Sequence, residues 1–356
     1  MLTNTFSFSD TDRLVSRFER IHASPYRNYG AFRAKVSEMI ATEPFLREEM
    51  ADIARLFRET RVDERKVALV KNCPIDRDVP VYDPDDPVRS KHMVKKTFVG
   101  EVLLEVVSQA CGLPILSYTT RNDGDFFQDV YAQKKYSDTQ TQKTDSDLYF
   151  HNDRTAHRVR ADVLCLLGMR SDPANVINTK YVHGTDLLRL VDPELHDILR
   201  QPNFATPFDL ISQDSNEFQV NSDNHPILIG ESAFRYYDVR TTVAASAPAI
   251  AWRALAAVKD AITKAPKLNV PIQTGELFIF PNLEGLHSRD KAHVPKPEAA
   301  RERYLLKTYN FWDESRRDAF ADLYVEGLPG LVDDARIDGA RIDDARIGGK
   351  PELVLA

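Results

Sequence analysis

Several classes of protein are excluded by what this chain lacks. It has only three cysteines (Cys73, Cys111 and Cys165), an odd number without disulfide or metal-site spacing, which favours a reducing cytoplasm. No stretch approaches the roughly 18 consecutive apolar residues of a membrane span. The segment from Met1 to Leu14 carries two aspartates and no basic, apolar leader, so we do not expect secretion.

An excess of positive charge is also missing. The net charge of −7 and the pI of about 5.8 argue against a surface for nucleic acid. The length of 356 residues would allow two domains, although β barrels often exceed the usual single-domain size. With 42% hydrophobic residues, the chain has ample material for a large core. We therefore expect a cytoplasmic protein without nucleic-acid or membrane partners, and its oligomeric state stays open.

The N-terminal part, residues 1–115, is predicted to be mostly helical. Apolar positions recur at intervals of three and four between Arg33 and Ile40, and Glu43-Pro44 breaks this pattern. A second helical run, from Val99 to Cys111, closes with Gly112-Leu113-Pro114.

Strand patterns dominate from residue 116 to 325, with one helical insert from Ala249 to Thr263 that follows Pro248. Residues 301–310 alternate between two faces. The other predicted strands are short aromatic or apolar runs: 126–131, 148–150, 163–169, 268–272 and 277–280. Helices first and many short strands afterwards predict a mainly β fold with α elements. We expect a double-stranded β-helix (jelly roll) with N-terminal helices and a helical insert, forming a single domain over residues 1–330.

Residues 331–356 differ in kind. A degenerate five-residue repeat, Asp-Asp-Ala-Arg-Ile and its variants, runs from Asp333 to Ile347 and leads to Gly348-Gly349. A period of five matches neither a helix nor a strand, so we expect a flexible, solvated tail.

The most informative residues are two histidines, a carboxylate and an arginine. His151 and Asp153 end an apolar stretch, and a second histidine, His287, lies far downstream. Two imidazoles and one carboxylate on a single face form the facial triad of non-haem Fe(II). Residues i and i+2 of a strand point the same way, so His151 and Asp153 are expected to face one interior. Arg303, sixteen positions after His287, would supply a fixed cation for 2-oxoglutarate.

With these residues in place, the sequence resembles the clavaminate synthase-like branch of the Fe(II)/2-oxoglutarate-dependent dioxygenases, which is related to taurine dioxygenase. The resemblance covers residues 120 to 310 in patches, and it lies in the order and spacing of short blocks. These blocks are Phe127-Gln128-Asp129-Val130-Tyr131, Phe150 to His157, Arg160 to Leu166 with Arg170, Gly275-Glu276-Leu277, His287-Ser288-Arg289 and Arg303 to Lys307.

The resemblance implies an oxygenase that uses Fe(II), 2-oxoglutarate and O2, and releases succinate and CO2. His151, Asp153 and His287 would bind the metal and form the catalytic centre. Thr179 and Arg303 would hold the far carboxylate of 2-oxoglutarate. Arg301 competes with Arg303, because the spacing here exceeds the usual family spacing by about two residues and both arginines fall on one face.

The family branch also implies a free amino acid, or a small derivative of one, as the substrate that is hydroxylated. Arg121 lies near where relatives place a group for the α-amino end, and Lys307 stands where many have the arginine for the α-carboxylate. Lysine replaces that bidentate fork with a point charge. Asp238 would suit a basic side chain and Arg240 an acidic or amide one. Asp153, which many relatives replace with Glu, would also face the substrate.

Other interpretations remain. The enzyme could act on a small organic acid or a sulfonate, or it could be a desaturase or cyclase of the same family. A non-enzymatic jelly roll that binds a small molecule would use the same fold without redox chemistry. His151 alone would be read as an ordinary buried histidine, and His157 and His183 favour surface or supporting roles over ligation.

Overall fold

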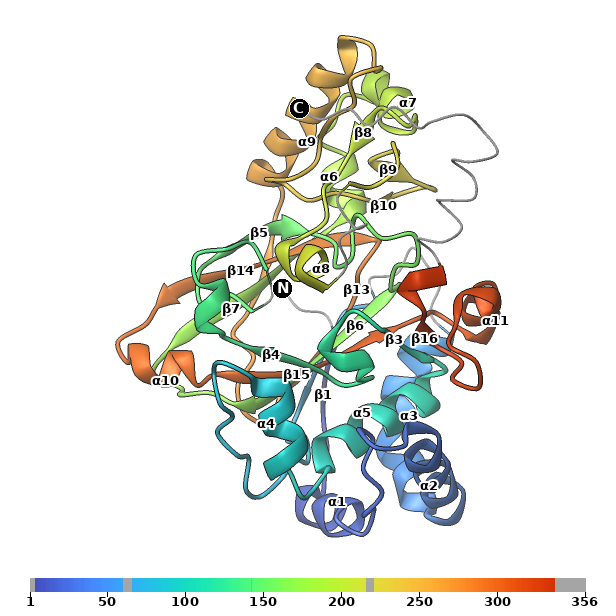
Figure 1. Cartoon of the computed structure of the whole chain (residues 1–356), viewed down its shortest axis with the longest axis vertical. Coiled ribbons are helices and arrows are strands. Elements are labelled where there is room, and N and C mark those ends of the chain that lie inside the picture. Colours follow the sequence, from blue (N-terminus) through green and yellow to red (C-terminus); the bar gives the residue numbers. More distant parts are fainter. Residues whose placement is uncertain (1–3, 60–65, 142, 216–220, 337–356) are drawn as a thin grey trace.

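Two main β-sheets form the centre of the molecule (Figure 1). The computed structural model describes residues 4–59, 66–141, 143–215 and 221–336. In the larger sheet the strand order is β1-β2-β13-β6-β15-β3-β16, and β4 pairs with β15 beside β3. Its strands are β1 (Asn4–Ser7), β2 (Ala68–Lys71), β3 (Ile115–Tyr118), β4 (Gln128–Tyr131), β6 (Val163–Arg170), β13 (Leu277–Pro281), β15 (Tyr304–Asn310) and β16 (Leu331–Val332).

The smaller sheet is antiparallel throughout, with the order β12-β7-β14-β5. Its strands are β5 (Leu148–His151), β7 (Val176–His183), β12 (Leu268–Val270) and β14 (Gly285–His293). Two further strand pairs lie outside the main sheets, β8 (Phe204–Ala205) with β11 (Thr242–Val243) and β9 (Leu228–Ile229) with β10 (Ala233–Phe234).

Strand alternation explains how the two sheets share one core. Along β6, Val163 and Cys165 pack with the N-terminal helices, whereas Leu164 and Leu166 point to the other side. There they join a cluster that also contains Tyr181 of β7, so this second cluster fills the space between the sheets. A strand with apolar neighbours on both faces reads as an unbroken apolar run, as the sequence did here.

Helices cover the outer face of the larger sheet. They are α1 (Thr11–Phe18), α2 (Tyr29–Thr42), α3 (Pro44–Glu59), α4 (Pro87–Val94) and α5 (Val99–Cys111). The predicted break at Pro44 separates α2 from α3. Gly112 caps the end of α5, and its φ of 68° is left-handed, as is common for a glycine at this position. The helices α1 to α5 all lie in the part of the chain that precedes β3.

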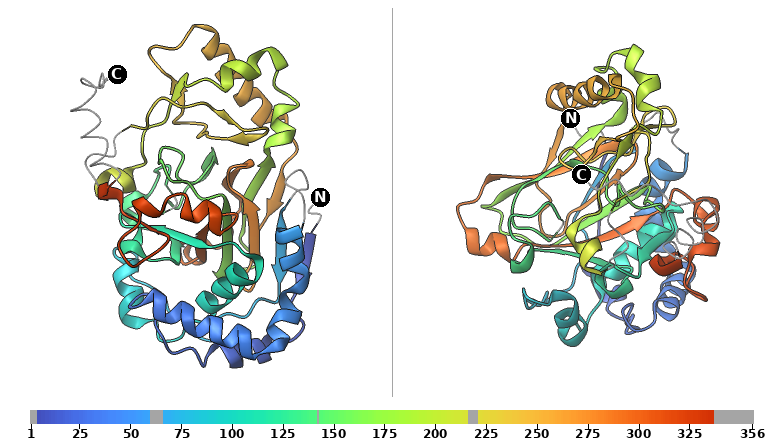
Figure 2. Two further views of the ribbon diagram at one scale, coloured as in Figure 1. Left: turned by 90° about the vertical axis from the view of Figure 1, so that its right-hand side faces the viewer. Right: turned by 45° about the horizontal axis from the view of Figure 1, so that its top comes forward.

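A second helical layer covers the smaller sheet. Val182 and Leu286 point outward from β7 and β14 and pack against α9 (Ile250–Lys264), the predicted insert. Figure 2 shows this order of layers from the side, with α9 at one end, the strands in the middle and the N-terminal helices at the other end. The remaining helices are short: α6 (Gly184–Leu188), α7 (His196–Leu199), α8 (Leu210–Ser215), α10 (Pro297–Arg301) and α11 (Glu314–Asp318), with 3-10 turns at Asn122–Gly124, Lys134–Tyr136, Pro193–Leu195 and Ala321–Leu323.

Two predicted boundaries were wrong. The strand expected from residue 301 begins at Tyr304, because Pro297 starts α10, which continues through Arg301. Residues 331–334 do not belong to the flexible tail expected from residue 331, since Leu331–Val332 pair with β3 and Asp334 is fully buried. Residues 337–356, which hold most of the repeat, lie outside the described residues. Among the helices described, none has the length and apolar character needed to cross a membrane.

Candidate active site

The two histidines meet across neighbouring strands of the smaller sheet. β5 ends at His151, which stands opposite His287 of β14 in the antiparallel register. Their ring centroids are 4.3 Å apart. Tyr181, the partner of His287 on β7, lies in the cluster between the sheets, so this face of the smaller sheet is the inner one. Residues that are about 136 positions apart are thus brought together by strand pairing.

Asp153 reaches the same point from the turn that follows β5. Its backbone N–H donates to Oδ1 of Asn282 at 2.8 Å, and the side chain of Asn152 donates to the carbonyls of Asn282 and Gly285. The turn is thereby tied to the connection that leads into β14. Asp153 Oδ1 lies 3.3 Å from Nε2 of His151 and 3.5 Å from Nε2 of His287.

These three side chains fit a metal ion. Their ligand atoms lie within 4.8 Å of one another, and the side chains are only 9%, 12% and 10% exposed for His151, Asp153 and His287. Adjacent ligands with bonds of roughly 2 Å lie about 3 Å apart, which is close to the 3.3 and 3.5 Å between Asp153 Oδ1 and the two imidazole nitrogens. Nδ1 of His151 lies 2.7 Å from the carbonyl of Tyr149, which directs Nε2 toward the metal position. Two imidazoles and one carboxylate suit Fe(II), with the remaining positions open to small ligands.

Lys307 holds the other oxygen of the carboxylate. It points inward from β15 of the larger sheet, and its Nζ lies 2.7 Å from Oδ2 of Asp153 and 2.9 Å from the hydroxyl of Tyr309. Burial alone would raise the pKa of Asp153, but Lys307 and the two imidazoles together hold it well below its usual range. Asp153 is therefore a carboxylate at neutral pH, as a metal ligand must be.

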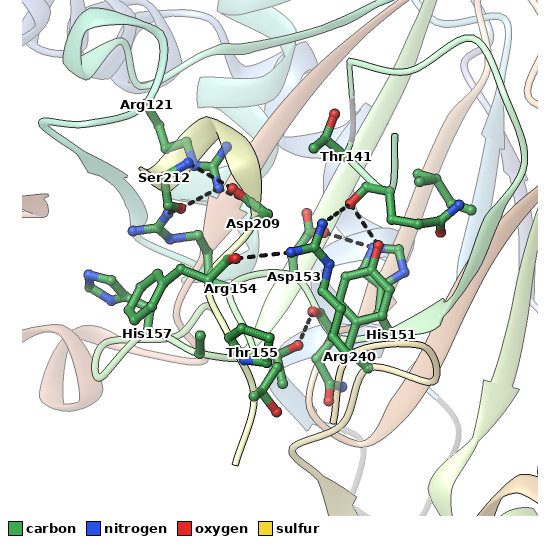
Figure 3. A pocket seen from close by; sticks show the side chains of 18 of the residues that line it. Arg121, Thr141, His151, Asp153, Arg154, Thr155, His157, Asp209, Ser212 and Arg240 are labelled. Atoms are coloured by element: carbon green, nitrogen blue, oxygen red, sulfur yellow. Dashed lines mark hydrogen bonds and ion pairs between the residues drawn. The ribbon is translucent and has the colours of Figure 1, made fainter. Parts of the chain in front are cut away.

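A cavity of about 550 Å3, including its open mouth, lies beside these residues (Figure 3). Figure 3 shows Arg121, Ser212 and Asp209 on one side of it and His151 and Arg240 on the other. Arg121 is buried, ion-pairs with Asp209 and donates to Ser212 at 2.8 Å. Burial would raise the pKa of Asp209, but Arg121 and then Arg154 lower it to about 2.

Arg154 and His157 line the same cavity, and both lie close to Asp334 of the C-terminal segment. Arg154 donates to Ser212 at 3.1 Å and lies 3.6 Å from a carboxylate oxygen of Asp334. His157 accepts from the backbone N–H of Val159 through Nδ1, and its Nε2 lies 2.7 Å from Asp334. Nδ1 also lies 2.7 Å from the carbonyl of Val159. Burial and then Arg154 lower the pKa of His157 to about 4, so the imidazole is neutral at pH 7. His157 thus has a supporting position, apart from the three side chains at the metal position.

The two charged residues predicted for the substrate side chain have different surroundings. Arg240 lines the cavity and donates to the carbonyls of Phe208 at 2.9 Å and Gln140 at 3.3 Å. Asp238 is not among the residues that line the cavity, and it accepts from the hydroxyl of Tyr236 and pairs with Lys259.

A second cavity, of about 650 Å3 with its mouth, is lined by Arg289 and Arg303. In the described part of the chain, the side chain of Arg303 makes no hydrogen bond or ion pair, and burial and then Arg289 lower its pKa to about 9. Thr179 of β7 is buried and stands opposite Arg289 in the strand register. Arg301 also borders this cavity, but it is exposed and pairs with Glu298 of its own helix.

Sequence reasoning missed several cavity residues. Asp209 lies just before α8 and Ser212 lies within it, and no local sequence pattern distinguishes either residue. Arg289 carried a usable signal, because it follows His287 by two residues on a strand and must share its face.

Comparisons with known proteins agree with this geometry. No family model matches the chain. An L-asparagine oxygenase from Streptomyces coelicolor is 26% identical over 284 residues, which cover 78% of this chain and 80% of the relative.

Solved structures resemble the fold closely. Asparagine oxygenase in complex with Fe(II), 3-hydroxyasparagine and succinate has a TM-score of 0.73 at 18% identity, covering 92% of this chain and 99% of the other. The non-heme iron oxygenase OrfP with Fe and alpha-ketoglutaric acid has a TM-score of 0.70 at 16% identity, with 92% and 99% covered. The resemblance that the residues predicted is therefore confirmed: in sequence and fold, this chain is similar to non-heme iron oxygenases of free amino acids.

Proposed function

We propose that this chain is an Fe(II)- and 2-oxoglutarate-dependent oxygenase that hydroxylates an unactivated C–H bond of a free amino acid or a small derivative of one. The observation that carries the proposal is the convergence of His151, Asp153 and His287 beside a cavity. Two neutral imidazoles and a carboxylate are the ligand set of non-haem Fe(II) oxygenases. The similarity to an L-asparagine oxygenase supports an amino acid as the substrate.

The fold assignment that accompanies this proposal is a double-stranded β-helix, forming a single domain over residues 1–330. Two observations support it. The metal position lies between the two main sheets, since His151 and His287 come from the smaller sheet and Lys307 from the larger one. The cluster of apolar residues that contains Leu164 and Tyr181 also lies between the two sheets.

Arg303 is the group that we assign to the far carboxylate of 2-oxoglutarate, with Thr179, the strand partner of Arg289, as a second donor. A cation that loses water without gaining a partner is costly, and a carboxylate would remove that cost through charge-assisted hydrogen bonds. Arg289, which donates to the carbonyls of Thr144 and Ser146, adds positive charge to the same cavity. Arg301 fits this role less well, because it is exposed and already has Glu298 as a partner.

When bound, iron with 2-oxoglutarate and O2 supplies the oxidising power, and succinate and CO2 are the co-products. The protein orients the reactants and excludes water. Lys307 keeps Oδ2 of Asp153 occupied, so that Oδ1 alone is directed at the metal position. The burial of all three ligands limits the access of solvent.

The test begins with anaerobic addition of Fe(II) and 2-oxoglutarate, which should produce a weak visible absorption band that neither component gives alone. Succinate release should then be stimulated by one of the common amino acids. Stimulation by a sulfonate or another organic acid instead would favour the alternative substrate class. A protein that gives neither the band nor succinate would be a binding module, and the proposal would be wrong.

A further inference from the structure

Arg240 differs from the other cations around the substrate cavity. Arg121 pairs with Asp209, Arg154 lies 3.6 Å from Asp334, and Lys307 pairs with Asp153. Arg240 donates its hydrogen bonds to main-chain carbonyls, lies against the ring of Tyr237, and makes no ion pair in the part of the chain that the structure describes. Among the described residues, its positive charge at the cavity wall has no counter-charge.

The guanidinium of Arg240 is held in a fixed place close to the metal position. The ring of Tyr237 stacks on His151 with centroids 4.8 Å apart, and Arg240 lies 5.4 Å from the centre of the same ring. The hydroxyl of Tyr237 and Nη2 of Arg240 both donate to the carbonyl of Gln140, which joins the two side chains. A substrate bound over the metal would therefore lie within reach of Arg240 (Figure 3).

Most of the hydrogen-bonding capacity of Arg240 is unused. A guanidinium has five N–H donors in a planar fork, and Arg240 makes two hydrogen bonds to the described residues. A carboxylate can accept two parallel bonds from such a fork. The opposite wall also has unused donors, since Nε of Arg121 and Nε of Arg154 are buried without an acceptor in the described residues. Cationic groups on opposite walls suit a molecule with a carboxylate at each end.

One carboxylate remains for an ammonium group. Among the described residues that line the cavity, Asp153 and Asp209 are the carboxylates, and Asp153 is assigned to the metal. Asp209 is 27% exposed at its side chain, although it already pairs with Arg121, so it can still contact a bound molecule. Among the described residues, the lining offers no further acid for a second, distal cation, which disfavours a basic side chain.

We propose that the substrate is an acidic amino acid, whose side-chain carboxylate is held by Arg240 and whose α-ammonium group faces Asp209. This inference rests on the proposed oxygenase function and adds the class of substrate. It departs from the named relatives, one of which is an L-asparagine oxygenase and another of which was solved with a hydroxylated arginine. Arg240 is then the residue that determines specificity between a carboxylate and an amide.

The experiment compares L-aspartate with L-asparagine and L-glutamate with L-glutamine, because each pair differs only in side-chain charge. Binding is followed anaerobically through the change that the amino acid causes in the visible band of the Fe(II)/2-oxoglutarate complex. Turnover is followed by succinate release. We expect one acidic member to bind and react better than its amide by roughly 10- to 100-fold, the range for a hydrogen bond to a charged group.

Arg240→Gln should remove most of this preference, and Arg240→Lys, which keeps the charge without the fork, should restore part of it. Arg253→Gln is the matched control, since Arg253 is an exposed residue of α9 that pairs with Asp192. Preference for an amide or a basic amino acid, or no response to either pair while the band forms, would overturn the inference. Equal losses for acid and amide in Arg240→Gln would also overturn it, because Arg240 would then hold the α-carboxylate. Absence of the band itself would instead contradict the oxygenase function.

Discussion

Lys307 Nζ lies 2.7 Å from Oδ2 of Asp153, whereas Oδ1 of the same carboxylate faces the two imidazoles at 3.3 and 3.5 Å. The two oxygens thus have separate partners. A carboxylate held in this way would bind a metal through one oxygen, which would leave other coordination positions for the cosubstrate.

The first prediction concerns that restraint. Lys307→Met would free Oδ2, so that the carboxylate could rotate or bind through both oxygens. We expect the rate of succinate release at saturating substrate to fall by roughly 10- to 100-fold, as for other groups that orient metal ligands. Lys307→Arg, which keeps a cation at this place, should recover part of the rate. An unchanged rate in Lys307→Met would contradict the restraint.

The second prediction separates the two candidate arginines for 2-oxoglutarate. Arg303→Met should raise the KM for 2-oxoglutarate by roughly 10- to 100-fold, because it removes a charge-assisted bond to the far carboxylate. Arg301→Met should leave this KM within about twofold, because Arg301 forms an exposed pair of the kind worth at most about 1 kcal/mol. Initial rates against the 2-oxoglutarate concentration measure both, and the reverse ranking would assign the role to Arg301.

The third prediction distinguishes a ligand from a supporting histidine. His151→Ala should abolish turnover and the visible band with Fe(II) and 2-oxoglutarate, because two of the three ligands cannot fix the metal. His157→Ala should keep the band and a measurable fraction of the rate, because His157 contacts Asp334 and Val159. Equal loss of the band in both variants would refute the ligand assignment.

The fourth prediction concerns the C-terminal segment. Asp334 accepts from the N–H of Thr120 at 3.1 Å and contacts His157, and it is fully buried. Asp334→Asn should lower the free energy of unfolding by about 1–3 kcal/mol and raise the KM for the amino acid, because Arg154 loses its counter-charge at the cavity wall. Asp333→Asn, at a partly exposed pair with Arg336, should change stability by less than about 1 kcal/mol. Urea unfolding and substrate titration measure both effects. Equal effects of the two variants would contradict the role of Asp334 in holding Arg154 and His157.

The fifth prediction is a loss of stability in acid. Burial, and then Arg235, lower the pKa of His225 to about 3 from a usual value of 6.5. Below pH 6.5 the unfolded chain therefore binds a proton at this histidine, whereas the folded protein does not. The contribution of His225 to the free energy of unfolding is fully present above that pH. It should fall by about 1.4 kcal/mol per pH unit from this group as pH decreases toward 3.

Urea unfolding at pH 7, 6 and 5 would reveal this slope. His225→Gln should make it shallower, whereas His22→Gln, at an exposed position, should leave it as in the unmodified protein. His157 and His287, whose pKa values are also lowered to about 4, add to this slope, whereas Glu101 and Glu284, whose pKa values burial raises to about 7, oppose it, so the test compares the slopes of the variants. A slope that His225→Gln does not alter would exclude His225 as its source.

Part of the site was predictable from local periodicity and from the order of short blocks. The strand pattern directed His151 to the interior, and the order of blocks indicated His287 as the distal partner. Strand alternation does not place Asp153, because β5 ends at His151 and the turn that holds Asp153 is fixed by Asn282. The start of β15 was not predictable from alternation, because a helix beginning at Pro297 includes Arg301. Asp334 was hidden for a different reason, since its repeat has no periodicity and only long-range contacts with Thr120 and His157 fix it. Asp209 likewise owes its position to Arg121, 88 residues away.

The three cysteines have a practical consequence for labelling. All are free and buried, and burial raises the pKa of each thiol, so that none is readily alkylated in the folded protein. Val239 is 48% exposed and adjoins Arg240. A fluorophore attached through a cysteine introduced at this position would report on the rim of the cavity without background from the native thiols.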